Sequence, residues 1–190
     1  MSFTIVTGIK CCWAALFFLW LVSALFTKRT QRWQPSVERL AQVAIALPGA
    51  YLIAGALHHD AWLSSRFVPD TQLVAWTGLV LTITGTLFAA WARLTLGANW
   101  SGIVTVKEEH ELVVRGPYAL ARHPIYTGIL LALAGTLLIN GQWRCIVGFS
   151  FIVVALAVKM RQEERLMTQT FPRAYPDYRR RVKALIPGVL

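Results

Sequence analysis

The residues that could do chemistry lie mainly in the second half of the chain, and the first group is Arg122-His123-Pro124-Ile125-Tyr126. A proline in the first turn of a helix loses no hydrogen bond, so Pro124 predicts that a helix begins here with His123 at its cap. Unpaired N–H groups and the positive end of the helix dipole would then favour an anionic or electron-rich group of a ligand. The same residues would equally serve only to begin a helix.

A second group lies nearer the C-terminus, where Glu163 and Glu164 are expected to follow the last apolar helix directly. Phe171, Tyr175 and Tyr178 come after them at spacings of four and three. The two carboxylates stand among basic residues, and exposed ion pairs of this kind are usually solvated and contribute little to stability. The tyrosines could line a site or anchor the chain at a membrane surface. Each group taken by itself leaves a structural and a functional interpretation open.

Common cofactor and metal motifs are absent from the sequence. No Gly-x-Gly-x-x-Gly follows a strand pattern and no Gly-x4-Gly-Lys-Ser/Thr occurs, which disfavours a soluble dinucleotide-binding or phosphate-loop enzyme. The Cys and His residues lack metal-ligand spacing, so no metal site is predicted. Chemistry by this chain would therefore depend on the polar groups above and on the elements that position them.

Those elements are five long segments without any Asp, Glu, Lys or Arg. The chain is 56% hydrophobic and 15% charged, with a mean hydropathy of +0.52, which is more apolar than a typical soluble domain. A membrane-spanning helix needs about 20 apolar residues; four segments reach the required range, and the fifth does so if Arg144 and Lys159 lie at the interfaces. The segments are Cys11–Thr27, Leu40–His59, Thr71–Ala92, His123–Trp143 and Cys145–Val158. The sequence thus predicts an all-α integral membrane protein with about five transmembrane helices. A tight turn is expected at Asn140-Gly141-Gln142, between the last two.

The basic residues predict how these helices are oriented. Nineteen Lys and Arg against nine Asp and Glu give a net charge of +10. If the five segments cross the membrane in turn, every Lys and Arg except Lys10, Arg66 and Arg144 falls on one side. Cations accumulate on the cytoplasmic side, which predicts a cytoplasmic C-terminus and an N-terminus outside. Anionic lipid then explains the basic tail, and we expect no nucleic-acid partner.

Taken together and in order, the motifs of the second half resemble those of one enzyme family. They are Asn99-Trp100-Ser101, His110-x-Leu112-Val113, Gly116-x-Tyr118, Arg122-His123-Pro124-x-Tyr126-x-Gly128, Glu163-Glu164, Phe171-x3-Tyr175-x2-Tyr178 and Ile186-Pro187. The set, which covers about residues 93–188, is similar to the isoprenylcysteine carboxyl methyltransferases. That resemblance implies an integral-membrane enzyme that uses S-adenosylmethionine and yields S-adenosylhomocysteine. The chain looks like the short prokaryotic members, so we expect a bacterial inner membrane.

The resemblance also implies a cytoplasmic cofactor pocket formed by the loop after the third helix, the hairpin of the fourth and fifth helices, and the tail. The residues implied to contact S-adenosylmethionine are Thr105, His110, Glu111, Leu112, Val113, Tyr118, His123, Pro124, Ile125, Tyr126 and Glu163. Where the family has an arginine that orients the substrate carboxylate, this chain has Lys159. Lysine keeps the charge but loses the planar two-point grip of arginine, and Arg161 is a second candidate for this role.

We therefore expect one membrane domain, with three transmembrane helices in residues 1–92 and a methyltransferase-like half in residues 93–190, acting on an isoprenylcysteine-like or other lipid-soluble acceptor. An ionised carboxylate is already a nucleophile, so its methylation needs alignment and exclusion of water rather than a base. An amine acceptor, as in the related phospholipid N-methyltransferases, would need a general base, and His123 or Glu163 would be candidates for that role.

Two further classes remain as alternatives. A sterol-reductase-like hydride transferase that uses NADPH would share a similar C-terminal half. A non-enzymatic membrane protein, such as a small transporter, is disfavoured because the five segments carry no charged residue at mid-membrane. The sequence predicts neither the oligomeric state nor the identity of the methyl acceptor.

Overall fold

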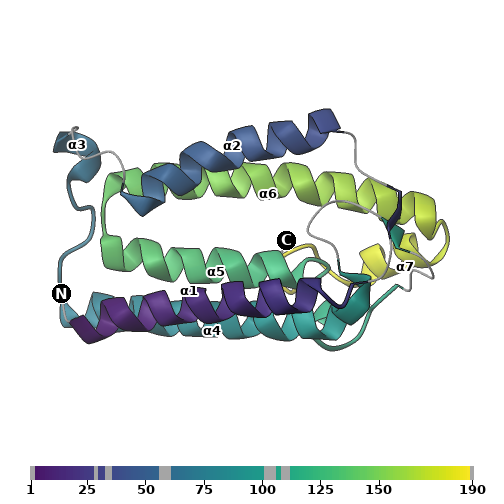
Figure 1. Cartoon of the computed structure of the whole chain (residues 1–190), viewed down its shortest axis with the longest axis horizontal. Helices are drawn as coiled ribbons and strands as arrows, with labels where there is room; N and C mark the ends of the chain where they lie inside the picture. Colours follow the sequence, from purple (N-terminus) through teal and green to yellow (C-terminus); the bar gives the residue numbers. More distant parts are fainter. Residues whose placement is uncertain are drawn as a thin grey trace.

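The computed structural model describes residues 3–27, 30–32, 36–55, 61–100, 106–107 and 112–188, and long helices make up most of these ranges (Figure 1). The five long helices are α1 (Phe3–Ala24), α2 (Ser36–Ala54), α4 (Gln72–Leu96), α5 (Pro124–Asn140) and α6 (Trp143–Thr170). Each contains most of one predicted apolar segment. The prediction of an all-helical chain with five long apolar elements is therefore confirmed at the level of the helices.

Short elements connect the long helices. They are α3 (Ala61–Ser64), η1 (Gly97–Asn99), η2 (Gly116–Ala119), α7 (Ala174–Arg181) and two short strands, β1 (Thr30–Arg32) and β2 (Val106–Lys107). The strands pair antiparallel, with Thr30 opposite Lys107. The sequence pattern does not predict this pair, because strands of two and three residues are too short to show an alternating pattern.

Three of the described helices, α1, α4 and α6, are long and apolar enough to cross a membrane. Helix α5 is apolar but has 17 residues, which corresponds to about 25 Å at 1.5 Å per residue. Helix α2 is not among the three; it has 19 residues, with Glu38 and Arg39 near its start and Pro48 in its interior. These helices support an integral membrane protein, whereas the count of five crossings and the division of the chain at residue 92 stay predictions.

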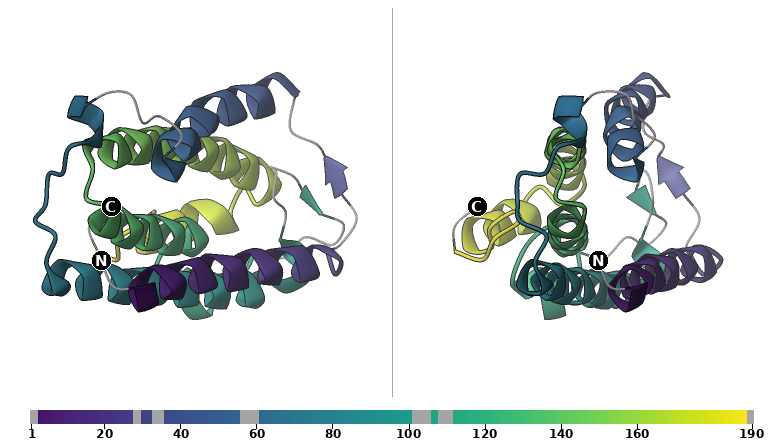
Figure 2. Two further views of the ribbon diagram at one scale, coloured as in Figure 1. Left: turned by 60° about the vertical axis from the view of Figure 1, so that its left-hand side comes forward. Right: turned by 90° about the vertical axis from the view of Figure 1, so that its left-hand side faces the viewer.

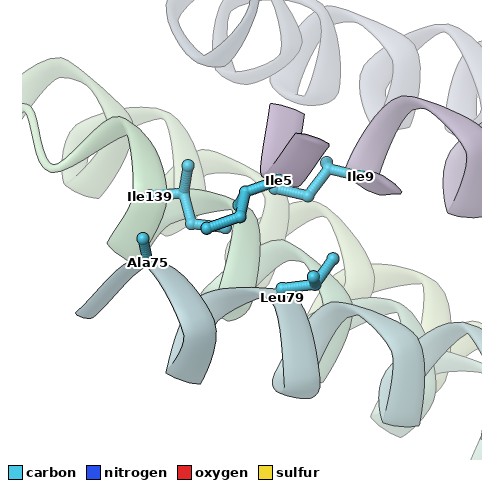
Figure 3. Close-up of a cluster of buried hydrophobic side chains, with 5 residues drawn as sticks. All are labelled: Ile5, Ile9, Ala75, Leu79 and Ile139. Atoms are coloured by element: carbon cyan, nitrogen blue, oxygen red, sulfur yellow. The ribbon is translucent and has the colours of Figure 1, made fainter. Parts of the chain in front are cut away.

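Helices α4 and α5 pack with their backbones in contact. A Cβ atom added to Gly85 would lie 2.5 Å from the carbonyl oxygen of Gly128, and one added to Gly128 would lie 2.6 Å from that of Gly85. Small residues allow helices to approach closely in membranes, where packing replaces the hydrophobic effect as the driving force. Helix α1 lies against the same pair through a cluster of buried apolar side chains (Figure 3): Ile5, Ile9, Ala75, Leu79 and Ile139.

Helix α2 packs on α6, and this pair lies beside the group formed by α1, α4 and α5 (Figure 1). The hairpin between α5 and α6 joins the two groups at one end. Gly141 forms its turn with a φ of +65°, a conformation that glycine adopts without strain, which confirms the turn predicted at this position. At the other end of the bundle, α7 and the C-terminal segment lie to one side of α5 (Figure 2).

Helix α6 is longer than the sequence pattern predicts. The expected apolar segment ends at Val158, but the helix continues to Thr170. The added residues are mostly good helix formers, and the helix stops only before Pro172, which disfavours helical geometry in the residue that precedes it. The expectation that Glu163 and Glu164 follow the helix is therefore wrong, because both lie within it.

Candidate functional site

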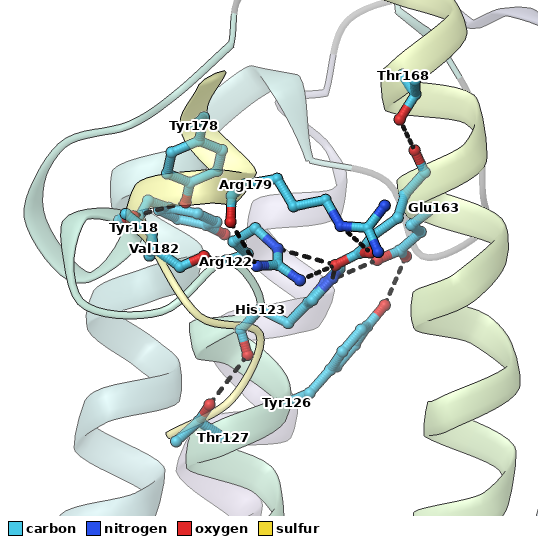
Figure 4. A network of polar contacts seen from close by, with 11 residues as sticks. Tyr118, Arg122, His123, Tyr126, Thr127, Glu163, Thr168, Tyr178, Arg179 and Val182 are labelled. Carbon is cyan, nitrogen blue, oxygen red and sulfur yellow. Dashed lines mark hydrogen bonds and ion pairs between the residues drawn. The ribbon is translucent and has the colours of Figure 1, made fainter. Parts of the chain in front are cut away.

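A polar cluster lies where the start of α5 faces the last turns of α6, beside α7 (Figure 4). Its side chains are Arg122, His123, Tyr126, Glu163, Glu164 and Arg179. The glutamates lie just past the apolar part of α6, about one turn after Val158. The cluster therefore joins the two helix groups at the end of the bundle opposite the α5–α6 turn.

The start of α5 is organised as predicted, with Pro124 in the first helical position and His123 as the preceding cap residue. The backbone N–H groups of Arg122 and His123, however, donate to the carbonyl oxygens of Lys183 and Ala184 at 2.8 and 2.9 Å. The C-terminal segment thus lies across the beginning of the helix. The chain itself therefore uses the N–H groups of the cap residue and of the residue before it, whereas a ligand at the first turn of α5 stays a prediction.

The imidazole of His123 lies between two carboxylates. Its Nδ1 is 3.4 Å from an oxygen of Glu163, and its Nε2 is 3.2 Å from an oxygen of Glu164. Burial by itself lowers the pKa of His123, but hydrogen bonds and charge from both glutamates outweigh burial and raise this pKa above its ordinary value. The contacts with both carboxylates therefore favour the protonated imidazole, which can donate from both ring nitrogens.

Glu163 is the more accessible of the two carboxylates, with 23% of its side chain exposed against 14% for Glu164. The hydroxyl of Tyr126 donates to one of its oxygens at 2.5 Å, and the Tyr126 ring stacks on His123. Lys159, one turn earlier in α6, places Nζ 5.6 Å from the centre of the Tyr126 ring. This face of α6 therefore presents a carboxylate and a cation side by side.

Glu164 is bound instead by arginines. One of its oxygens accepts from Nε and Nη2 of Arg122 at 2.9 and 2.6 Å, and the other lies 3.5 Å from Nε of Arg179. Arg122 also donates from Nη1 to the carbonyl oxygen of Val182 at 2.5 Å. Glu164 therefore connects α6 with the start of α5 and with α7.

An apolar cluster lies beneath these polar groups. Its buried members are Ala92, Tyr118, Ile125 and Tyr126, with Trp20, Leu96, Trp100, Val113, Ile129, Leu156, Met160 and Leu185 packed against them. The hydroxyl of Tyr178 donates to the carbonyl oxygen of Tyr118 at 2.6 Å, which fixes η2 to α7. Side chains from α1, α4, α5, α6 and the tail thus meet around Tyr126.

The structure brings together many of the predicted cofactor residues. Val113, Tyr118, Ile125 and Tyr126 share the apolar cluster, His123 and Glu163 are in contact, Pro124 is buried at the start of α5, and Leu112 adjoins Val113. Thr105, His110 and Glu111 lie outside the described residues. Arg161 is exposed and two residues from Lys159 on a continuous helix, so it does not face the cluster.

Sequence reasoning missed three contributors to this end of the molecule. The sequence gives Glu164 no role separate from that of Glu163, and the carbonyl groups of the tail carry no sequence signal. The third is Arg93, which is buried and donates to the carbonyl oxygens of Ser23 and Gly97 at 2.8 and 2.9 Å. Its guanidinium lies 4.3 Å from the ring centre of Trp100. A lone cation at the end of an apolar helix could have predicted a helix-capping arginine.

The described residues contain no group of three or more His, Cys, Asp or Glu that could hold a metal ion. Long apolar helices with a charged cluster at one end define the class of this molecule, an all-helical integral membrane protein.

Comparison with known proteins shows which family this chain resembles. The sequence model of the isoprenylcysteine carboxyl methyltransferase (ICMT) family matches residues 77–169, which include the helices and side chains of the cluster up to Glu164. Among curated relatives, the chain is 28% identical over 135 residues to the protein-S-isoprenylcysteine O-methyltransferase of Dictyostelium discoideum. It is 30% identical over 115 residues to protein-S-isoprenylcysteine O-methyltransferase B of Arabidopsis thaliana. Residues 77–169 of this chain therefore resemble the ICMT family.

These alignments cover only part of each protein. They take in 68% of this chain and 57% of the Dictyostelium protein, and 59% of this chain and 58% of the Arabidopsis protein. The protein-S-isoprenylcysteine O-methyltransferase of Saccharomyces cerevisiae is 32% identical over 122 residues, or 63% of this chain and 51% of the yeast protein. The chain thus spans somewhat more than half the length of these relatives. All three are eukaryotic, so they do not support the expected resemblance to prokaryotic members.

Proposed function

We propose that this chain is an integral-membrane methyltransferase that uses S-adenosylmethionine to methylate the carboxylate of an isoprenylcysteine-like, lipid-soluble acceptor. The match of residues 77–169 to the ICMT family model supports the reaction class. The observation that favours a carboxylate acceptor is the environment of His123, whose two ring nitrogens each face a carboxylate oxygen, at 3.4 and 3.2 Å.

The cluster has groups that suit the methyl donor. S-adenosylmethionine carries an ammonium group, a sulfonium, ribose hydroxyls and a carboxylate. The partly exposed carboxylate of Glu163 would hold the ammonium or the ribose, and the apolar wall of Val113, Tyr118 and Ile125 would border the rest of the cofactor. Charge-assisted hydrogen bonds of this kind are among the stronger polar contacts in proteins. When bound, the cofactor supplies an activated methyl group on sulfur.

The residues of the chain then need only to position the acceptor and exclude water. Lys159 lies one turn before Glu163 on the same face of α6, where its ammonium would hold the acceptor carboxylate. Buried aromatic and aliphatic side chains around Tyr126 exclude water from the reacting atoms. An acceptor carboxylate is ionised at neutral pH, so alignment alone makes it reactive. No described side chain has to accept a proton.

An amine acceptor fits the cluster less well. An ammonium group must lose its proton before it can attack, and His123 and Glu163 are the bases that the sequence suggests. The two neighbouring glutamates raise the pKa of His123 and favour its protonated form, which makes it less suited to accept a proton. Glu163 already accepts a hydrogen bond from Tyr126 and pairs with His123. Phospholipid N-methylation therefore lacks a suitable base in the described part of the cluster.

The orientation in the membrane belongs to the same proposal. The cluster lies at the end of the bundle that carries α7, whose last turn is Arg179-Arg180-Arg181. Cations near a membrane helix mark its cytoplasmic end, so we place the cluster and the C-terminus on the cytoplasmic side. A bacterial inner membrane remains our prediction from the sequence.

The test is a transfer assay with purified protein in nanodiscs, radiolabelled S-adenosylmethionine and N-acetyl-S-farnesylcysteine as acceptor. We expect label in the acceptor as a base-labile methyl ester. Calorimetry with S-adenosylhomocysteine and with NADPH is run in parallel. Label transferred to phosphatidylethanolamine instead of the prenylcysteine, or binding of NADPH without binding of S-adenosylhomocysteine, would overturn the proposal.

A further inference from the structure

We propose that Glu164 is a positioning residue, which fastens the C-terminal segment of residues 182–185 across the start of α5 and thereby holds His123 against Glu163. Any effect of Glu164 on turnover rests on the proposed methyl transfer. The positioning of residues 182–185 and of His123 by Glu164 depends only on contacts within the chain.

The first step is the way in which Glu164 binds Arg122. Both Nε and Nη2 of the guanidinium donate to the same carboxylate oxygen, and the arginine and glutamate side chains are only 9% and 14% exposed. A charged pair that is largely removed from water holds its geometry far better than an exposed pair does. Glu164, which projects from α6, therefore fixes the orientation of Arg122 at the start of α5.

The second step passes from Arg122 and its neighbours to the tail. Four successive carbonyl oxygens accept hydrogen bonds from groups at the start of α5. Residue 182 accepts from Nη1 of Arg122, residue 183 from the Arg122 backbone N–H, residue 184 from the His123 backbone N–H, and residue 185 from Oγ1 of Thr127. The distances are 2.5, 2.8, 2.9 and 2.8 Å. This segment has no helix or strand of its own, so these bonds determine its path.

The third step is the division of the His123 ring between adjacent glutamates. Glu164 takes Nε2 and Glu163 takes Nδ1, so rotation of the ring would break both contacts. The remaining partners of Glu164 are arginines of the framework, whereas Glu163 contacts the Tyr126 hydroxyl and is more exposed. Glu163 is thus the carboxylate available to a ligand, and Glu164 the one that sets the position of His123.

The pH behaviour of His123 provides a measurement that a purely structural role would leave unchanged. The charged and titratable groups around it are Glu163, Glu164 and Lys159 from α6, Arg122 before α5, Tyr126 from α5, Tyr118 from η2, and Tyr175 and Arg179 from α7. Loss of one carboxylate charge in direct contact lowers the pKa of an imidazolium by about one pH unit or more. Glu164→Gln should therefore make His123 titrate at lower pH.

The experiment compares E164Q and E163Q in the full chain, with E38Q as a matched control for loss of an exposed carboxylate on α2. The His123 imidazole is followed by NMR, its signal being identified from the spectrum of H123Q. Release of the tail is followed by trypsin cleavage after Lys183, which is exposed. For E164Q we expect titration at lower pH and cleavage about tenfold faster or more, which matches loss of a charged hydrogen bond. For E163Q we expect lower-pH titration with cleavage at the wild-type rate.

Equal cleavage rates in E164Q and wild type, or equal acceleration in E163Q and E164Q, would overturn the positioning role. If E164Q fails to fold, E164D keeps the charge with a shorter reach. E164D should fold and should show a near-wild-type titration of His123, but its tail should be cleaved faster than that of wild type. Cleavage of E164D at the wild-type rate would likewise overturn the proposal. Failure of the proposed function shows itself separately, as absence of methyl transfer by the wild-type protein while the tail and imidazole measurements still hold.

Discussion

The two ends of the helix bundle use their cations in different ways. At the end that carries α3, Arg66 donates to the carbonyl oxygen of Asn140 at 3.0 Å, and Arg144 donates to those of Leu52 and Ile53 at 2.5 and 3.3 Å. These carbonyls lie in the last turns of α5 and α2. At the α7 end, arginines bind the Glu164 carboxylate instead. Among the described residues, the arginines of the α3 end thus act mainly on backbone groups, whereas those of the α7 end bind the Glu164 carboxylate as well as backbone carbonyl groups such as that of Val182.

The contacts at the α3 end account for two of the three cations that lie on the side opposite the predicted cytoplasmic side. Arg66 and Arg144 fall on the sparsely charged side because two helix C-termini there need donors and attract positive charge. Lys10 is a different case, because it lies within α1 and is exposed. The long side chain of a lysine in a membrane helix can reach the interface. The exceptions are therefore compatible with the proposed orientation.

The largest effect should come from Glu163→Ala at the α7 end. Loss of the carboxylate that we assign to the cofactor should weaken binding of S-adenosylhomocysteine about 100-fold, since a hydrogen bond to a charged group contributes about 1.5–3 kcal/mol. Calorimetry on the detergent-solubilised protein measures this affinity. The matched variant at the α3 end, Arg144→Ala, should bind like wild type. An affinity for E163A within threefold of wild type would remove Glu163 from the cofactor site.

The next effect separates two residues on one face of α6. Lys159→Ala should leave cofactor affinity unchanged and lower kcat/KM for a prenylcysteine acceptor by about 10- to 100-fold, because the acceptor carboxylate loses its charged partner. Lys159→Arg, unlike Lys159→Ala, should keep much of the activity, since arginine provides a two-point contact with the carboxylate. Equal loss of cofactor affinity in K159A and E163A would contradict this division of roles.

A smaller effect, on stability alone, should follow substitution at the α3 end. Arg144→Ala leaves carbonyl groups at the end of α2 without their donor and should lower the free energy of unfolding by about 1–3 kcal/mol. A lower Tm in detergent, with unchanged affinity for S-adenosylhomocysteine, would show it. Lys10→Gln is the control, since exposed substitutions usually change stability by less than about 0.5 kcal/mol. An unchanged Tm in R144A would mean that capping at this end contributes nothing.

The smallest effect concerns pH. The pKa of His123 is higher in the folded protein than its ordinary value, so its charge stabilises the fold fully below the unfolded pKa of about 6.5. This contribution is lost as the pH rises through the folded pKa, at no more than about 1.4 kcal/mol per pH unit for one proton. The Tm of wild type should therefore fall relative to that of H123Q between neutral and alkaline pH. A Tm difference that is constant over this range would show that His123 is not charged in the fold.

The local signals in the sequence proved sufficient for most of the helices. Runs without charge marked all five long helices, Pro124 marked the start of α5, and Gly141 marked the turn after it. The limit of α6 was misjudged because only apolarity was followed, although its polar residues 159–170 are good helix formers. Helix propensity and hydropathy are separate signals, and only helix propensity indicates how far a helix continues beyond the membrane.

The sequence predicted which residues belong to the candidate site better than it predicted how they contact one another. Ordered motifs around His123 and Glu163 indicated the resemblance to the ICMT family and predicted that both residues contact one cofactor. They did not indicate that adjacent glutamates have different partners, because successive residues on a helix point about 100° apart and only the packing of α5 and α7 decides what each one meets. The positions of Arg122 and residues 182–185 likewise depend on contacts between segments 60 residues apart.

By itself, the sequence determined the apolar helices and the resemblance to the ICMT family, and it predicted an orientation, because composition and short motifs act locally along the chain. Only the tertiary structure decided that His123 is shared by two carboxylates, that the tail takes the N–H groups at the start of α5, and that Arg66 and Arg144 cap distant helices. Charge pairing and hydrogen bonding depend on separations of about 3 Å in space, and separation along the chain does not specify them.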